Sequence, residues 1–253
     1  MNLLFFASAT GEYNDFVLPF LTSALIHNPG SGCEILTDNP ELFQESGNRI
    51  RELYGGQVLI RAIPARYDSW KNAPHLAGAI RFVIIPKLEA NYTYIGDIDI
   101  LTLDAVGKAH IPRLEERMMA YDNIIRPGTK RLTGLHFVKS YSWYSRLLPS
   151  YLESVSAWYE QSDLNSDEGL LYVITEEKFM MVSPEEDYRP VHGIHISPNR
   201  TIDGDPGWGV SKTRAEQFLE MMEHPEWKLM SPYFTDRFNG LQDQITNYAK
   251  RIL

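Results

Sequence analysis

The sequence predicts an α/β protein with a mostly parallel sheet flanked by helices. Short apolar runs alternate with segments of helical periodicity along the first hundred residues, which is the order of a parallel sheet with crossover helices. Glycine, proline and asparagine separate these segments, as expected at turns. A length of 253 residues with 43% hydrophobic residues suits one domain over 1–253.

The elements of the first half follow in order. A continuous apolar run at 2–8 predicts a buried strand. Apolar residues three and four apart then predict a helix over Asn14–Ile26. The next expected elements are strands at 33–40 and 57–64 with a helix around Glu41–Tyr54 between them, a helix at Ala73–Leu88 and a strand within 91–103.

The second half is predicted to hold three more strands and four helices. The strands are expected within 117–123, 131–139 and 188–197, and the helices at Ser140–Glu160, Asp167–Thr175, Ser211–His224 and Asn239–Leu253. Proline and glycine concentrate in 184–209, which predicts a long functional loop there.

Composition excludes several classes of protein. The net charge of −9 would repel DNA or RNA, and we find no basic patch in the sequence, so no nucleic-acid partner is expected. Mean hydropathy is −0.29, and no apolar run reaches the roughly 18 residues of a membrane span. Cys33 is the one cysteine, which excludes an internal disulfide framework and a cysteine-clustered metal site. With no basic leader segment, a reducing, cytoplasmic location is expected.

Two carboxylates follow a predicted buried strand. In extended backbone, Asp97 and Asp99 would point to one side and Ile98 to the other. Open α/β sheets bind ligands beyond the carboxyl ends of their strands, and hard divalent cations prefer oxygen ligands. The pair therefore indicates a metal–diphosphate site, and a solvated turn is the alternative reading.

Several landmarks accompany this pair in a familiar order. They are Thr10 and Tyr13 after the first strand, TSALIHN at 22–28, LTDN at 36–39, Arg81, YIGDIDIL at 94–101, TGLHFVK at 133–139, SDEGLLYVI at 166–174 and VHGIHIS at 191–197. Through these segments and their order along the chain, the protein resembles nucleotide-sugar glycosyltransferases of the GT-A fold. It is most similar to the branch of glycogenin and the lipopolysaccharide galactosyltransferases.

The resemblance implies a GT-A, Rossmann-like mixed sheet. Residues 1–103 would form a nucleotide-binding half, and 104–253 an acceptor half with C-terminal helices. The chain departs from the family pattern at Gly96, at Thr133 in place of asparagine and at Glu168 in place of glutamine, and it lacks the closing Lys-Pro-Trp signature. These departures leave the sugar and the acceptor open.

The resemblance also implies a metal site. Asp97, Asp99 and His195 are the expected ligands of Mn²⁺ or Mg²⁺, and Asp97 would also reach the ribose hydroxyls. His192 and His195 are three residues apart, so on a strand they face opposite ways and only one should join the site. For each histidine, a hydrogen-bonded position in the core or at its rim is the alternative.

Further residues are candidates for the substrates. Tyr13 could stack on a nucleobase that the backbone of Ala7 and Thr10 reads, or it could cover a helix start. Asp38 could bind the base or cap the following helix, and Arg81 could meet phosphate or a carboxylate.

The remaining candidates concern the diphosphate and the transferred sugar. Arg200 and Lys212 could close over the diphosphate, or they could be solvated. Asp122, Asp167 and Glu168 are the expected catalytic residues, which would hold the sugar and the acceptor hydroxyls.

The expected function is metal-dependent transfer of a sugar, with retention, from a nucleotide-sugar donor such as a UDP-sugar to a saccharide or other hydroxyl acceptor. A metal-dependent nucleotidyltransferase or phosphoesterase is one alternative, although the first loop, SATGEYND, has no Lys or Arg. A nucleotide- or sugar-binding protein that keeps the fold without turnover is the other.

Overall fold

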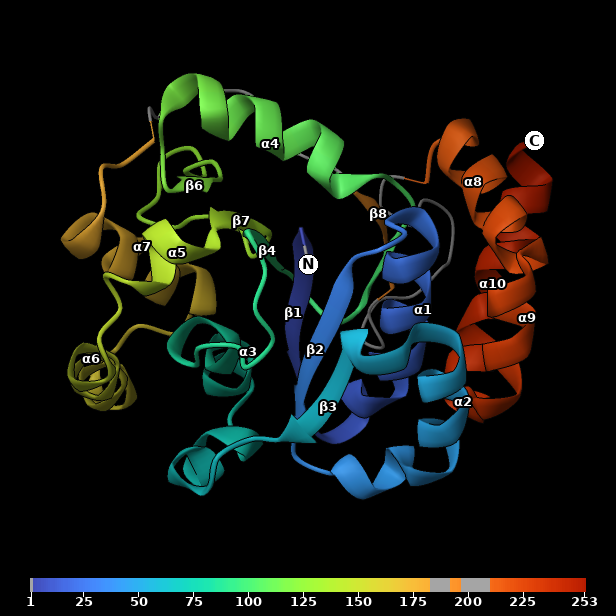
Figure 1. Ribbon diagram of the computed structural model, residues 1–253, viewed down its shortest axis with the longest axis horizontal. Helices are drawn as coiled ribbons and strands as arrows, with labels where there is room; N and C mark the ends of the chain where they lie inside the picture. Colours follow the sequence, from blue (N-terminus) through green and yellow to red (C-terminus); the bar gives the residue numbers. More distant parts are fainter. Residues whose placement is uncertain (1, 183–191, 197–209) are drawn as a thin grey trace.

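A mixed six-stranded sheet forms the centre of the protein (Figure 1). The computed structural model describes residues 2–182, 192–196 and 210–253. The strand order is β3–β2–β1–β4–β7–β6. Strands β1 to β4 are parallel to one another, β7 is antiparallel to β4, and β6 is antiparallel to β7, so that β7 alone runs against the other five. The strands are β1 Leu3–Ala9, β2 Gly32–Thr37, β3 Val58–Ala62, β4 Tyr92–Ile95, β6 Tyr121–Asp122 and β7 His136–Lys139.

Helices cover both faces of this sheet (Figure 1). They are α1 Val17–His27, α2 Gln44–Tyr54, α3 Pro74–Val83, α4 Val106–Arg117, α5 Ser140–Tyr144, α6 Pro149–Gln161, α7 Asp167–Lys178, α8 Lys212–Glu223, α9 Pro225–Met230 and α10 Asp236–Ile252. Short 3₁₀ helices lie at η1 Gly11–Phe16, η2 Pro40–Phe43, η3 Gly55–Gln57, η4 Ala65–Asn72 and η5 Ser231–Tyr233.

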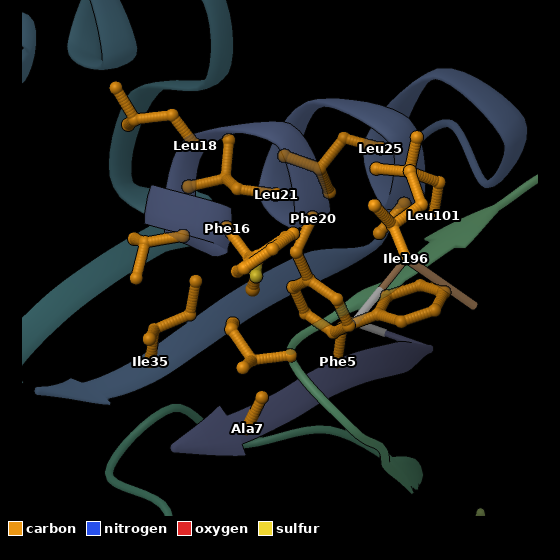
Figure 2. Packing of buried hydrophobic residues seen from close by; sticks show 14 of the residues in the cluster. Phe5, Ala7, Phe16, Leu18, Phe20, Leu21, Leu25, Ile35, Leu101 and Ile196 are labelled. Carbon is orange, nitrogen blue, oxygen red and sulfur yellow. The ribbon is translucent and has the colours of Figure 1, made fainter. Parts of the chain in front are cut away.

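The alternation of side chains along β1 divides the core into two layers. Phe5 and Ala7 face the layer with α1 and the C-terminal helices, where Phe5 meets Phe20 edge to face with ring centroids 6.4 Å apart (Figure 2). Phe6 faces the other layer, with α3, α6 and α7. All seven residues of β1 are buried, as a central strand covered on both faces requires.

Some predicted elements differ from the structure. The helix expected at Ser140–Glu160 is two helices, because Leu148, the residue before Pro149, is non-helical with a ψ of 146° and Pro149 opens α6. The helix expected to reach Leu88 ends at Val83, shortly before Pro86. In the 117–123 segment only two residues form a strand, β6. Among the described helices, none is both long and apolar enough to cross a membrane.

A second, small sheet carries the candidate site. Strand β5, Ile100–Thr102, follows residues 96–99, called the acidic loop from here on, and pairs antiparallel with β8, Gly193–His195. A Cβ on Gly193 would lie 1.7 Å from the carbonyl oxygen of Leu101, so only glycine permits this close pairing. The pairing brings together two segments that are more than ninety residues apart in the sequence, 100–102 and 193–195.

Candidate functional site

A cavity of about 560 Å³ lies beyond the carboxyl ends of β1 and β4. Its lining comes from the loop after β1, the end of η4, helix α3, the acidic loop after β4, the segment between β6 and β7, the start of α7 and the end of β8. The described residues that line it are Ser8, Thr10, Gly11, Glu12, Tyr13, Lys71, Asn72, Pro74, Ala77, Gly78, Arg81, Asp97, Ile98, Asp99, Arg126, Gly134, Asp167, Glu168 and His195. This is the position at which open α/β sheets bind ligands.

Both predicted carboxylates of the acidic loop line the cavity, but for a different local reason. The sequence analysis assumed extended backbone, whereas residues 98–99 form a turn in which the N–H of Ile100 donates to the carbonyl of Asp97. Ile98 and Asp99 are both largely buried, with exposed fractions of 4% and 6%. The turn, and not the alternation of a strand, therefore brings Asp97 and Asp99 to one cavity.

Asp99 and His195 form one wall of the cavity. Their Oδ2 and Nε2 atoms are 3.0 Å apart. The N–H of Ile196 donates to the carbonyl of Asp99 at 2.6 Å, and Ile100 pairs with His195 across the small sheet. His192 lies elsewhere, buried with its Nε2 atom 2.6 Å from Nε2 of His110. Of the two histidines, His195 is the one that the structure brings to the cavity.

Arg81 joins two carboxylates of the cavity. One Nη2 atom lies 2.5 Å from Asp97 and 2.9 Å from Asp167, and the arginine is only 4% exposed. Burial lowers the pKa of Arg81, but the nearby carboxylates, Asp97 foremost, outweigh it and raise the pKa overall. The sequence analysis expected either phosphate or a carboxylate as the partner of Arg81, and the structure shows two carboxylates.

Asp167 and Glu168 lie in the first turn of α7, where Ser166 caps the helix by accepting from the N–H of Gly169. Glu168 forms an ion pair with Arg126 and accepts from the N–H of Gly134 at 3.3 Å. Burial raises the pKa of the Asp167 carboxyl, and the charge of Arg81 opposes that rise. Both acids line the cavity, as their predicted role requires.

A metal ion would find two protein ligands already side by side. Among the described residues, no three His, Cys, Asp or Glu side chains are grouped to hold a metal. Asp99 and His195 supply an oxygen and a nitrogen on the cavity wall, whereas the carboxylate of Asp97 is bound by Arg81. The donor chemistry fits a cation that completes its coordination with ligand oxygens, with Asp99 and His195 as its protein ligands.

The loop after β1 shapes the end of the cavity predicted for the nucleobase. Thr10 and Tyr13 line it. Ala7 does not, because it is completely buried within β1, and Ser8 lines the cavity in its place. Asp38 neither lines the cavity nor caps the helix that follows it. It accepts from the N–H of Gly11, the first residue of η1, at 2.9 Å and from Asn14 Nδ2 at 2.6 Å, and so fixes the loop after β1.

Asp122 is the predicted catalytic residue that the structure places away from the cavity lining. It lies on β6, buried, with His110 Nδ1 at 2.7 Å and Arg113 Nε at 3.2 Å. Burial raises the pKa of Asp122, but these two partners outweigh it and lower the pKa. We expected Asp122 to contact the substrates, but in the structure it contacts His110 and Arg113 outside the cavity lining.

Of the two cations expected over the diphosphate, the structure describes Lys212. Lys212 is exposed at the first residue of α8 and does not line the cavity, and Arg200 falls outside the described residues. Sequence reasoning missed Lys71, Asn72 and Arg126 in the lining. The visible signal was RPGTKR at 126–131, a local basic segment that corrects the expectation of no basic patch in the sequence.

Comparisons with known proteins identify the fold. Models of protein families and curated protein sequences give no match. Solved structures do match: the glycosyltransferase GlyE of Streptococcus pneumoniae TIGR4 has a TM-score of 0.56 at 11% identity over 95% of this chain. The galactosyltransferase LgtC, in complex with donor and acceptor sugar analogues, has a TM-score of 0.54 at 14% identity over 91% of this chain.

The chain therefore has the GT-A fold of these glycosyltransferases, as its sequence predicts. The alignment covers 64% of the GlyE chain and 100% of the LgtC chain. At these identities the likeness establishes the arrangement of strands and helices, and the chemistry of this chain has to be argued from its own site.

Proposed function

We propose that this protein is a glycosyltransferase that moves a sugar from a nucleotide-diphosphate donor, such as a UDP-sugar, to a hydroxyl acceptor. The observation that carries the proposal is the contact of Asp99 with His195 on the wall of a cavity at the carboxyl ends of β1 and β4, in a chain with the GT-A fold. The cavity has room for a ligand of this size class.

The two halves of the cavity wall suit the two parts of such a donor. Tyr13 and Thr10 offer a ring and polar groups for a base and ribose. The acidic loop and His195 would hold Mn²⁺ or Mg²⁺, and the nitrogen ligand favours Mn²⁺. When bound, that ion would stabilise the negative charge that develops on the departing diphosphate.

The protein's own residues then position the reacting sugar. Asp167 and Glu168 come from the first turn of α7 and are fixed by Arg81 and Arg126. The carboxylate oxygens of both acids line the cavity and can accept hydrogen bonds from sugar hydroxyls. Retention of configuration is part of the proposal, since with a retaining transfer the departing phosphate can receive the acceptor proton and the cavity needs no separate general base.

A nucleotide-sugar-binding protein without turnover is the second candidate. The departures at Thr133 and Glu168 favour it, because at both positions this chain differs from the pattern of the glycosyltransferases that it resembles. Incubation with a panel of nucleotide sugars, followed by mass spectrometry for transferred or hydrolysed sugar, separates the two. Donor binding without any product selects the second candidate.

The metal site is tested by thermal shift with UDP, with and without Mn²⁺. Saturating ligand at about 100 times its Kd adds about 2.7 kcal/mol to the stability of the native protein. We expect Asp99→Asn to remove the Mn²⁺-dependent part of this shift, and the exposed Asp243→Asn on α10 to keep it. An unchanged shift in the Asp99 variant contradicts the proposed metal site.

A further inference from the structure

A basic hairpin end borders the proposed reaction cavity. Residues 126–131 form a closed loop above the bridge between Ile125 and Leu132. The N–H of Arg126 donates to the carbonyl of Arg131 at 2.8 Å, and Thr129 donates through both its N–H and its hydroxyl to the carbonyl of Arg126. Gly128 adopts a φ of +68°, which L residues rarely allow. These bonds give the loop a defined shape.

The charge of this loop is opposite to that of the whole chain. The chain has a net charge of −9, yet the segment 123–135 carries Arg126, Lys130 and Arg131 and no acidic residue. Lys130 and Arg131 are exposed and form no ion pair with any described residue. Two cations of this loop are therefore available to an anionic ligand.

The loop also lines a second, open cavity that shares Arg126 with the first. This cavity of about 360 Å³ is lined by residues 125–130 and by Tyr172. Arg126 lines both cavities. Tyr172 lies four residues after Glu168 on α7, so the two face the same side of that helix. The N–H of Leu132 donates to the carbonyl of Glu168 at 3.3 Å, which fixes the loop to the start of α7.

We propose that the second cavity is a subsite for an anionic group of the acceptor, and that the acceptor is a saccharide carrying a carboxylate or a phosphate. Lys130 would bind the anionic group, Tyr172 would contact the sugar ring, and Arg126 would lie between this group and the reacting hydroxyl. The proposal rests on the proposed function, because it takes the neighbouring cavity as the place of sugar transfer.

The test measures binding of matched neutral and acidic sugars to the whole protein by ligand-observed NMR at low salt. Glucose, glucuronate and glucose 6-phosphate are the probes, so that carboxylate and phosphate are compared on one ring. We expect both acidic sugars, or one of them, to bind more tightly than glucose, and Lys130→Gln to weaken that binding about two- to fivefold, the usual range for an exposed charge pair. Lys130→Arg, which keeps the charge, should retain binding.

Lys250→Gln is the matched control, because Lys250 is exposed on α10, at the opposite side of the molecule from α7 (Figure 1). Equal binding of all three sugars, or no binding of either acidic sugar, contradicts the subsite, and so does unchanged binding in Lys130→Gln. UDP binding with Mn²⁺, measured on the same samples, separates the two proposals. If the wild-type protein does not bind UDP with Mn²⁺, the result counts against the proposed function. If it binds UDP but shows no preference for acidic sugars, only the subsite is overturned.

Discussion

Replacement of Arg81 by methionine removes the cation that holds two carboxylates together in the cavity. The Arg81 side chain is 5% exposed, and Asp97 and Asp167 lie 2.5 and 2.9 Å from it. Methionine keeps most of the side-chain volume and is a good helix former within α3, so the packing of the core should survive. What changes is that two neighbouring carboxylates lose their counter-ion.

The expected loss is about 3 kcal/mol in the free energy of unfolding. Removing one partner of a buried ion pair costs about 3–5 kcal/mol, and the lower end applies because Asp97 and Asp167 remain 30% and 26% exposed. For a chain of this size, that loss corresponds to a fall in Tm of roughly 6–12 °C. Arg49→Met is the matched control, because the Arg49–Glu52 pair at 2.7 Å is exposed and should contribute at most about 1 kcal/mol.

The loss should depend on pH. Burial already raises the pKa of Asp167, and Arg81 opposes that rise, so the variant raises it further. A carboxyl with a raised pKa in the folded state binds a proton more tightly there than in the unfolded state. The deficit is therefore full above the folded-state pKa and shrinks as the pH falls through it. Urea unfolding at about pH 7 and about pH 4.5 measures both values.

Two results would refute this reasoning. One is a variant within about 1 kcal/mol of the wild-type protein at neutral pH, no different from the exposed control. The other is a deficit that stays constant between the two pH values, which would place its origin in packing and not in the uncompensated carboxylates.

Two further predictions concern close packing and a buried acid. Gly134→Ala should weaken binding of UDP with Mn²⁺ roughly tenfold, because the new Cβ would lie 2.9 and 3.0 Å from the Asp97 oxygens. Gly47→Ala, where a Cβ meets nothing within 4 Å, should leave UDP binding unchanged; calorimetry compares the two, and equal affinities contradict the prediction. Glu34→Gln should lose about 3 kcal/mol of stability in urea, because completely buried Glu34 accepts from Arg61 and from the N–H groups of Lys87 and Leu88. A loss below about 1 kcal/mol would show that a neutral amide satisfies those donors.

Much of the fold could be predicted from the sequence, because local patterns carry it. The uniform apolar run of β1 is a direct consequence of burial on both faces. The apolar spacing of three and four residues predicted α1, although the structure buries residues 17–25 on every side of that helix. Helix α4 was not predicted: its interior contains Pro112, and only Val106, His110 and Leu114 of its residues are buried. A short buried stripe around a proline gives no clear periodic signal.

The candidate site divides in the same way. The sequence alone determined the strand that ends at the acidic loop and the residue types that can meet a diphosphate, because these depend on neighbours along the chain. Only the tertiary structure decided that His195 lies beside Asp99, that Arg81 joins Asp97 to Asp167, and that Asp122 belongs to a buried ion pair elsewhere. Those contacts join residues as much as 96 positions apart, and the free energy that selects them comes from packing of the whole chain.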